Sequence, residues 1–392
     1  MTNIVNERDV VIVGSGPAGC ATALALHRYD PSLTRNVLVL EALRHPREKV
    51  CAGGINGRAW GLLEQLGVNV DVPHVEINGV FVKTARGEIW QESPGITRVV
   101  LRDEFDAAVA AHLVRQGIEL REDTRVLALK REGNRIVIET TAGVFRSYAV
   151  VGADGVASVV RRNLFDSVDD TYLMAIASCP AKGHFTHEQK AVYLDFSLAA
   201  HGARGYRWIF PFLRDSEEWI NTGICEWRHR SASELKEDLA RYLKSNDMDP
   251  ARAIFRFFPV RPFHPRNPFC APGVILAGEA AGIDPFFGEG VSYAIEYGML
   301  AADSIAEALR RRDFSFQGHM KALKWSRVGK ELMMSLAAAK LFYGGLHRTF
   351  AKALHSDDRF LYLLTEVLSG RLEPSTMLAI KMLVRIASAL VK

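Results

Sequence analysis

A glycine-rich turn between a buried strand and a helix sets the strongest limit on how this chain can fold. The stretch DVVIVG, which ends at Gly14, is a continuous apolar and β-branched run, as expected of a strand buried on both faces. Gly14, Gly16 and Gly19 have the spacing G-x-G-x-x-G, and CATALALHRY (20–29) has helical periodicity. NVLVLE (36–41) is a second buried strand. The segment therefore predicts a βαβ unit with a site for a dinucleotide at its first turn.

Each glycine of this turn has its own physical use. The first allows the tight turn, the second lets a pyrophosphate approach the backbone, and the third lets helix and strand pack closely. Glu41 lies 22 residues after Gly19, at the end of the second strand, where an acid binds ribose hydroxyls. The expected cofactor-binding residues here are Gly14, Gly16, Pro17, Ala18, Gly19 and Glu41. This motif alone fits NAD as well as FAD.

Composition excludes several classes of protein. Five cysteines, at positions 20, 51, 179, 225 and 270, form no C-x-x-C pair, which favours a reducing compartment over a disulfide scaffold. No apolar run reaches the roughly 18 residues that span a bilayer. The formal net charge of +4 is too weak to indicate nucleic-acid binding. We therefore expect a cytoplasmic protein without metal ligands, either free or peripheral to a membrane.

Two further glycine-bearing strand ends separate FAD from NAD. VVGADG brings Asp154 to the end of a strand, and LAGEAAG brings Gly278 and Glu279 to the end of another. DPFFGEG follows and opens a helix at Gly290. This order resembles the flavoprotein hydroxylase and reductase superfamily, whose members carry GxGxxG, a central DG, and a late GD followed by a P…GxG helix start. The resemblance implies FAD, with Asp154 near the pyrophosphate and nicotinamide path and Glu279, where the family usually has Asp, on the ribityl chain.

The same resemblance implies further cofactor contacts. Gly288 and Gly290 would bring a helix N-terminus to the N1–C2=O edge of the flavin, where the helix dipole offsets the charge of the reduced ring. LRDEFD (101–106) resembles the family's R-x-x-F-D helix start, whose arginine, here Arg102, contacts the cofactor; the alternative is a solvated helical arginine. We also expect cofactor contacts from Val126, Pro285 and Val291. No second GxGxxG follows a strand, so NAD(P)H or another low-potential donor would visit the flavin transiently.

The order of motifs predicts an α/β fold with a discontinuous Rossmann-like FAD-binding domain, an inserted β-sheet substrate domain and a helical C-terminal region. At 392 residues the chain is long enough for two or three folding units. The expected ranges are 1–75, 99–165 and 265–312 for the FAD-binding domain, 76–98 and 166–264 for the β-rich substrate domain, and 313–392 for the helical region.

Two segments indicate which flavoenzyme this is. KVCAGGI (49–55) resembles the C-x-G-G loop of the geranylgeranyl reductase family, and GYRWIFP (205–211) resembles that family's Y-x-W-x-F-P strand. In an extended strand Tyr206, Trp208 and Phe210 point to one face and would form an apolar wall. The resemblance implies an FAD-dependent reductase of carbon–carbon double bonds in an isoprenoid, geranylgeranyl-type lipid or prenyl group. The candidate catalytic residues are Cys51, Tyr206 and Trp208, with Ala52 and Gly53 beside the cofactor and Phe210 and Pro211 beside the substrate.

Alternatives remain open at these positions. The alternating aromatic residues would also suit a plain core strand, and Cys51 would also suit a small buried site. Cys51 and Tyr206 are candidates for tuning or proton delivery; whether Cys51 is an acid, a charge-transfer donor or a spacer is open. Phe212 follows Pro211 where the family usually has a basic residue, which argues against phosphate binding there. The alternative function is an FAD-dependent monooxygenase or halogenase of an aromatic or polyketide-type metabolite, although W-x-F-P falls short of the halogenase W-x-W-x-I-P. A flavin-binding protein without turnover is a third reading.

The positive charge is concentrated at the C-terminal end. Residues 313–392 carry a surplus of six basic residues, so the remainder is slightly acidic. In MLAIKMLVRIASALVK (377–392), Lys381, Arg385 and Lys392 share a helical stripe, which predicts either peripheral membrane contact or a solvated face of a packed helix. Further cations could receive a substrate phosphate: Arg327, Lys330, His347 and Arg348. The expected partners are therefore a prenyl lipid or another apolar small molecule, a membrane surface and a redox partner, but no nucleic acid.

Overall fold

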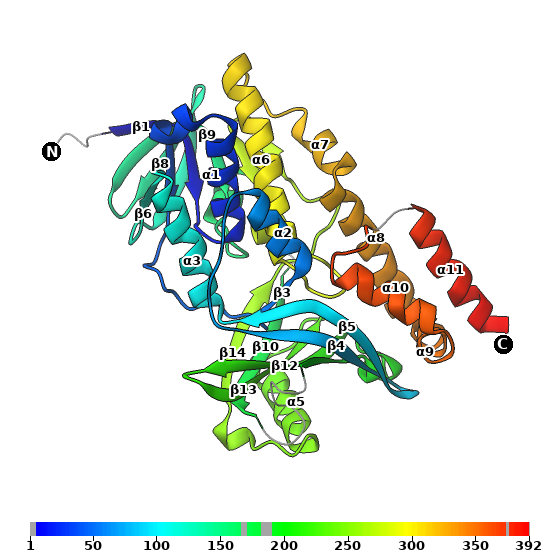
Figure 1. Cartoon of the computed structure of the whole chain (residues 1–392). Helices are drawn as coiled ribbons and strands as arrows, with labels where there is room; N and C mark the ends of the chain where they lie inside the picture. Colours follow the sequence, from blue (N-terminus) through cyan, green and yellow to red (C-terminus); the bar gives the residue numbers. More distant parts are fainter. Residues whose placement is uncertain (1–4, 166–170, 182–189, 374–375, 392) are drawn as a thin grey trace.

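The computed structural model describes residues 5–165, 171–181, 190–373 and 376–391. Within them, two sheets and a set of C-terminal helices form three parts, with the first sheet and its helices at the upper left of Figure 1, the second sheet below and the C-terminal helices at the right. This arrangement confirms the α/β fold class and the helical C-terminal region.

The first sheet carries the dinucleotide turn. Its central strands are parallel, with β1 between β2 and β9, β16 beyond β9 and β6 beyond β2. A hairpin of β7 and β8 extends it from β9. The strands are β1 Val5–Val13, β2 Val37–Leu40, β6 Glu119–Arg121, β7 Val126–Glu132, β8 Arg135–Thr140, β9 Gly143–Gly152, β15 Cys270–Ala271 and β16 Val274–Leu276. All four residues of β2 are buried, as the continuous apolar run predicts.

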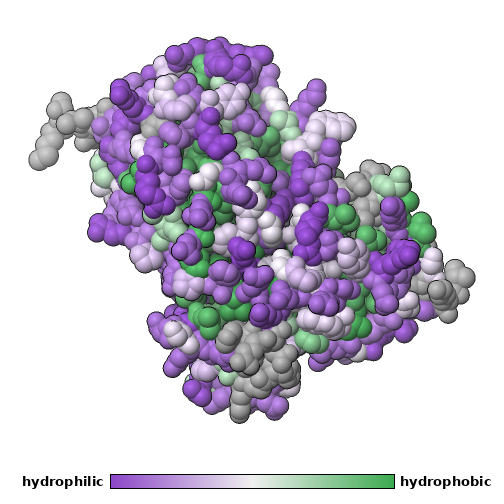
Figure 2. Space-filling model, in the orientation of Figure 1, coloured by the Kyte–Doolittle hydropathy of each residue, from purple (hydrophilic) through white to green (hydrophobic). Residues whose placement is uncertain are grey.

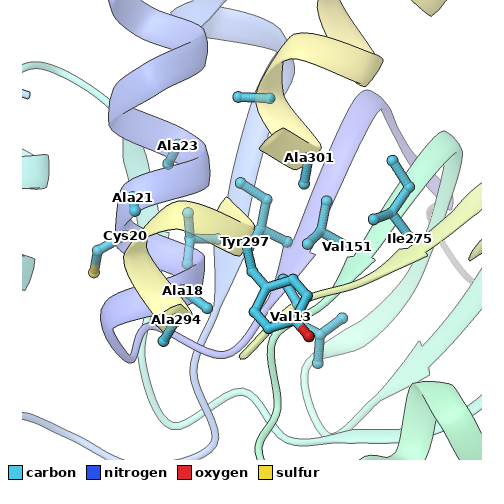
Figure 3. Close-up of a cluster of buried hydrophobic side chains, with 14 of the residues drawn as sticks. Val13, Ala18, Cys20, Ala21, Ala23, Val151, Ile275, Ala294, Tyr297 and Ala301 are labelled. Atoms are coloured by element: carbon cyan, nitrogen blue, oxygen red, sulfur yellow. The ribbon is translucent and has the colours of Figure 1, made fainter. Parts of the chain in front are cut away.

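Small side chains let two helices lie close together on this sheet. They are α1 Pro17–Tyr29 and α6 Val291–Arg311, and the other helices of this part are α2 Gly57–Gln65, α3 Arg102–Arg115 and α4 Val159–Leu164. A Cβ at Gly298 of α6 would lie 2.4 Å from the Ala18 carbonyl oxygen of α1. Figure 3 shows the alanines of both helices, Ala18 and Ala294 among them, gathered beside the strands. The close packing therefore places the beginnings of both helices near the same end of the sheet.

The second sheet is mostly antiparallel and has the order β14-β10-β13-β12-β11-β4-β5-β3. Its strands are β3 Gly54–Asn56, β4 His74–Thr84, β5 Gly87–Val100, β10 Tyr172–Pro180, β11 Ala191–Asp195, β12 Gly205–Arg214, β13 Glu217–Glu226 and β14 Ile254–Val260. The helix α5 Ala232–Ser245 packs against it and begins with a capping box of Ser231 and Glu234. The segment 54–56, expected in the FAD-binding domain, instead pairs with β5 in this sheet, because the chain crosses over directly after the C-A-G-G loop.

The C-terminal helices are α7 His319–Trp325, α8 Arg327–Leu341, α9 His347–Ser356, α10 Asp358–Leu368 and α11 Thr376–Val391, with a π-helical turn at Phe342–Leu346. Buried charges join them to the first part. Arg58 of α2 donates to Glu296 of α6 at 2.6 Å and pairs with Glu331 of α8, and Arg327 contacts Glu331 at 2.7 Å. The cluster therefore fixes α8 against the helices of the cofactor side.

The outer face of α11 is apolar. Met377, Ile380 and Val384 are 63%, 51% and 58% exposed, and Figure 2 shows hydrophobic residues at this right-hand edge of the molecule. Lys381 is also exposed, but Arg385 forms an ion pair with Asp357, so it belongs to the packed side of the helix. Lys392 lies outside the described residues. None of the described helices has both the length and the apolar character needed to cross a bilayer.

Candidate functional site

A cavity of about 810 Å³ lies where the motif-bearing ends of the first sheet meet the second sheet. Most of the residues expected to bind cofactor or substrate line it: Gly14, Gly16, Pro17, Ala18, Glu41, Cys51, Ala52, Arg102, Val126, Asp154, Tyr206, Trp208, Phe210, Gly278, Glu279, Gly288, Gly290 and Val291. Gly19, Gly53, Pro211 and Pro285 do not line it. Segments far apart in the sequence thus form one site, at the upper end of the volume range of ligand pockets.

The dinucleotide turn is shaped by backbone geometry. Gly14 has φ +98°, and a Cβ there would lie 2.4 Å from the Ala153 carbonyl oxygen. A Cβ at Gly19 would lie 1.9 Å from the Gly14 carbonyl oxygen, so Gly19 supports the turn from behind the cavity. Gly16 is the N-cap of α1, and no side chain caps the helix. The backbone N–H groups of the first turn are therefore available to an anion in the cavity.

Glu41 is held in place by the turn itself. Its Oε2 accepts hydrogen bonds from the Ser15 backbone N–H at 3.0 Å and the Ser15 hydroxyl at 2.7 Å, and its Oε1 accepts from the Leu43 N–H at 3.1 Å. Burial acts to raise the pKa of this carboxyl, but Arg47 and the Ser15 hydrogen bonds outweigh burial and hold the pKa below its usual value. Glu41 is thus a fixed carboxylate at the cavity wall.

A chain of charges links Glu41 to the C-A-G-G loop. Arg47 Nε lies 3.3 Å from Glu41 Oε2, and its Nη1 lies 3.4 Å from Asp106 Oδ2. Asp106 also accepts from Arg102 Nε at 2.9 Å. Arg102 is buried, which excludes the solvated helical arginine; burial opposes its charge, but Asp106 and then the Cys51 thiol raise its pKa above the usual value. Arg47 was not among the expected site residues, because it stands in an irregular loop and belongs to none of the motifs.

The loop that carries Cys51 is anchored to both sheets. The Cys51 carbonyl oxygen accepts from Asn221 Nδ2 at 3.1 Å, and its Sγ accepts from the Gly53 N–H at 3.4 Å. Lys49 Nζ lies 3.0 Å from Glu279 Oε2 on the opposite side. Gly53 has φ +86°, and a Cβ there would lie 2.4 Å from a backbone oxygen. Gly53 is therefore a position in the loop where a side chain would not fit. Glu279 has a cationic partner, Lys49, that no motif indicated.

The expected aromatic residues form one wall of the cavity. Trp208 Nε1 donates to Asn221 Oδ1 at 3.1 Å, so Asn221 connects this wall to the Cys51 loop. The Phe210 ring packs on Gly54, where a Cβ would lie 2.8 Å from Phe210 Cε2. Asn221 was missed because it stands on a neighbouring strand, opposite Phe210 in the register, and only the sheet pairing brings it here.

Tyr206 stands in this wall, and its hydroxyl already has an acceptor. Its ring stacks on Phe196 with centroids 5.0 Å apart, and its hydroxyl donates to the Phe287 carbonyl oxygen. Burial raises the pKa of the hydroxyl well above its usual value. Because the hydroxyl already donates to this backbone carbonyl, the geometry favours a packing role for Tyr206 over the expected proton delivery.

The residues present fit an FAD. Asp154 Oδ2 accepts from the Val160 N–H at 3.2 Å, while Oδ1 is buried without a hydrogen-bond partner among the described residues, and burial raises the pKa of the carboxyl. The helix α1 begins after Gly16 without a side-chain cap, whereas at the start of α6 the Ser292 N–H already donates to Glu289 Oε1 at 3.0 Å. The uncapped N-terminus of α1 and the unpartnered oxygen of Asp154 are groups that phosphates and hydroxyls satisfy.

Only two of the four C-terminal cations expected to receive a phosphate line a cavity. Arg327 pairs with Glu331 and Glu373, so it is not a free receptor for a phosphate, contrary to the expectation. Lys330 is exposed and lines neither cavity. His347 and Arg348 line a second chamber next to the main cavity.

Comparison with known proteins defines the class. Residues 7–315 match the family model of the FAD binding domain, so the chain belongs to that family. It is an FAD-dependent oxidoreductase. Within this class it is similar to digeranylgeranylglycerophospholipid reductase 3 of Methanosphaera stadtmanae, with 25% identity over 366 residues that cover 86% of this chain and 88% of the relative.

Solved structures share the fold. A geranylgeranyl bacteriochlorophyll reductase-like protein from Thermoplasma acidophilum superposes with a TM-score of 0.72 and 20% identity, covering 99% of this chain and 96% of the other. The flavin-dependent brominase Bmp2 superposes with a TM-score of 0.68 and 20% identity, covering 94% and 95%. At such identities the match concerns the fold alone.

Proposed function

We propose that this protein uses reduced FAD to saturate carbon–carbon double bonds in the isoprenoid part of a geranylgeranyl-type lipid. The observation that carries the proposal is one cavity in which the FAD motifs face a wall of Tyr206, Trp208 and Phe210. The similarity to a digeranylgeranylglycerophospholipid reductase supports the same substrate class.

Each half of the cavity has a distinct task in this reaction. FAD, when bound and reduced, supplies a hydride to one alkene carbon. The first turn of α1 would bind its pyrophosphate, Glu41 a ribose and the Glu279 region the ribityl chain, while the N-terminus of α6 would stabilise negative charge on the ring. An isolated alkene is a poor hydride acceptor, so the aromatic wall must hold it close to the ring and exclude water.

Cys51 is our candidate for the group beside the reacting atoms. It lies between the cofactor wall and the aromatic wall, and its backbone is fixed by Asn221. With the Tyr206 proton donated to Phe287, the Cys51 thiol is the group we assign to proton supply for the second alkene carbon. Arg102 beside the thiol would stabilise the thiolate that remains.

Product analysis tests the reaction directly. Flavin-loaded protein reduced with dithionite is incubated with geranylgeranyl phosphate and geranylgeraniol, and mass spectrometry measures the gain of two hydrogens per saturated bond. Replacing dithionite with NADPH tests the electron donor. Cys51→Ala should lose most of the turnover and keep its FAD, whereas Cys270→Ala, at a half-buried cysteine outside the cavity, should behave as the wild type.

The same assay exposes the alternative reaction. Absence of saturated product with every prenyl substrate would refute the proposal. Oxygen-dependent hydroxylation or halogenation of an aromatic compound would instead favour the monooxygenase or halogenase, whose fold this chain shares with the brominase.

We also propose that α11 contacts a lipid surface through Met377, Ile380 and Val384, with Lys381 beside them. This position would bring the enzyme to a membrane-bound substrate. Sedimentation with anionic vesicles tests it: Ile380→Asp should reduce binding, and Val114→Asp, a change at an exposed apolar residue of α3 that lines neither cavity, should not.

A further inference from the structure

An irregular loop, residues 41–53, leads from the first sheet to the second along the main cavity. It connects the end of β2 to the beginning of β3 and contains no helix or strand. Most of its residues line the cavity, from Glu41 to Ala52. Glu279, in the turn after β16, lines the same cavity. A cofactor in this cavity would therefore contact two segments that are far apart in the sequence.

One ion pair joins the loop to that turn. Lys49 Nζ lies 3.0 Å from Glu279 Oε2, and the two side chains are 35% and 18% exposed. Both residues line the cavity, so the pair lies where the cavity borders solvent. Glu279 Oε2 also lies 3.9 Å from where a Cβ of Gly155 would be, which places the carboxyl beside the D-G turn. The pair therefore bridges the two segments at the edge of the cofactor cavity.

The side chain of Glu279 is long enough for two interactions at once. Only its Oε2 takes part in the ion pair, so Oε1 can accept a hydrogen bond from a hydroxyl of the ribityl chain. An aspartate at this position would be shorter by one C–C bond, about 1.5 Å, and would end short of Lys49. The length of the glutamate is thus what lets one carboxylate serve both partners.

A second ion pair of the same loop provides a comparison. Arg44 pairs with Asp123 at 2.8 Å, but these side chains are 74% and 58% exposed, and neither residue lines the cavity. Pairs this exposed contribute little, because water and salt screen them. The pair of Lys49 with Glu279 is more shielded, and a bound cofactor would shield it further. Of these two pairs, the one at the cavity is therefore expected to hold the loop more firmly.

We propose that Lys49 is a positioning residue for the cofactor: paired with Glu279, it keeps the loop closed against the bound FAD and slows release of the FAD. Release requires the loop to move away from the turn after β16, and this movement breaks the pair. Cys51 follows Lys49 by two residues, so the same pair keeps the thiol beside the cofactor. The inference rests on the use of FAD in the proposed function and does not depend on which bond the FAD reduces.

The dissociation rate of FAD tests the pair without requiring turnover. Flavin-loaded protein is diluted, and the change in flavin fluorescence reports the release. Lys49→Met and Glu279→Asp should each speed release about fivefold or more, the upper end for a partly exposed ion pair, and the double variant should release FAD no faster than either single variant. Lys49→Arg, which keeps the charge, should stay within about twofold of the wild type. Arg44→Met is the matched control and should also stay within about twofold, because its pair is exposed and outside the cavity.

The salt dependence of release is a second measurement on the same proteins. Between about 0.05 M and about 0.5 M salt, release from the wild type should become faster, because salt screens the pair. Release from Lys49→Met should change less, since the pair is already absent.

Each outcome decides the proposal. Unchanged release from Lys49→Met, or an equal salt response of this variant and the wild type, would overturn the inference. Additive effects of Lys49→Met and Glu279→Asp would mean that the two residues contact FAD separately, and equally fast release from Arg44→Met would mean that any cation of the loop serves; both results also overturn it. The expected pattern together with no saturated prenyl product would uphold the pair and refute the proposed reaction. A wild type that binds no FAD would refute both.

Discussion

The two walls of the main cavity are built on different physical principles. The cofactor wall consists of glycine turns and the beginnings of α1 and α6, where the backbone itself would meet the ligand. The facing wall consists of large side chains, with Tyr206 held by a hydrogen bond to the Phe287 carbonyl and Trp208 by one to Asn221. The first wall requires particular φ angles and the absence of a Cβ, and the second requires volume and packing. Substitutions in the two walls should therefore impair the protein in different ways.

The largest expected effect is on the cofactor wall. Gly14→Val places a branched side chain where a Cβ alone would lie 2.4 Å from the Ala153 carbonyl oxygen, at φ +98°. The variant should purify without bound flavin, as measured by the absorbance of flavin per protein. Gly133→Val is the matched control, since Gly133 also has a positive φ but nothing lies within 4 Å of its Cβ. A yellow Gly14→Val protein would mean that the turn does not shape the cofactor site.

The next effect concerns the attachment of the C-terminal helices to the cofactor side. Arg58→Met removes the cation between Glu296 and Glu331 and leaves the largely buried Glu296 without this partner, while Arg327 still contacts Glu331. The free energy of unfolding should fall by about 3–5 kcal/mol, as for other broken buried pairs. Urea unfolding measures the loss. Arg359→Met, at an exposed cation of α10, should change stability by less than about 0.5 kcal/mol. A negligible loss for Arg58→Met would show that apolar packing alone holds these helices.

Two buried carboxyls should respond to pH with opposite signs. Glu41 has a lowered pKa, so its contribution to the free energy of unfolding is fully present above pH 4.5, the ordinary pKa of a glutamate. This contribution is lost as pH falls through the lowered pKa. Asp284 has a raised pKa because of burial, despite accepting from the Phe286 and Phe287 N–H groups. The contribution of Asp284 to the free energy of unfolding is fully present below pH 3.8, the ordinary pKa of an aspartate. It is lost as pH rises through the raised pKa.

The experiment compares unfolding of the wild type, Glu41→Gln and Asp284→Asn from about pH 3 to about pH 7, with FAD at one fixed concentration. The loss of unfolding free energy caused by Glu41→Gln, relative to the wild type, should shrink as pH falls. The unfolding free energy of Asp284→Asn, relative to the wild type, should rise as pH rises. If the unfolding free energies of the two variants, each relative to the wild type, changed with pH in the same way, the opposite pKa shifts of Glu41 and Asp284 would be contradicted.

The sequence predicts the cofactor wall better than the facing wall, for a physical reason. A site built from backbone is encoded in consecutive residues, and Gly14, Gly16 and Gly288 all line one cavity. The facing wall depends on contacts between strands and helices distant in the sequence. Asn221 reaches Cys51 only through the pairing of β12 with β13, and Arg86 meets α9 only when the C-terminal helices are placed. No periodicity or short motif records such juxtapositions.

The smallest expected effect decides what Tyr206 does. Tyr206→Phe keeps the ring that stacks on Phe196 and removes only the hydroxyl, so the Phe287 carbonyl loses one donor at a cost of about 0.5–1.5 kcal/mol in unfolding free energy. If the residue is part of the wall, the rate of alkene saturation should change less than about threefold, whereas loss of a general acid typically costs 10²-fold or more. Tyr206→Ala, which removes the ring as well, should lower the rate more than Tyr206→Phe does, because the alkene loses a packing surface. A rate for Tyr206→Phe as low as that for Tyr206→Ala would mean that the hydroxyl takes part in the reaction. The aromatic wall would then contribute a reacting group as well as a packing surface.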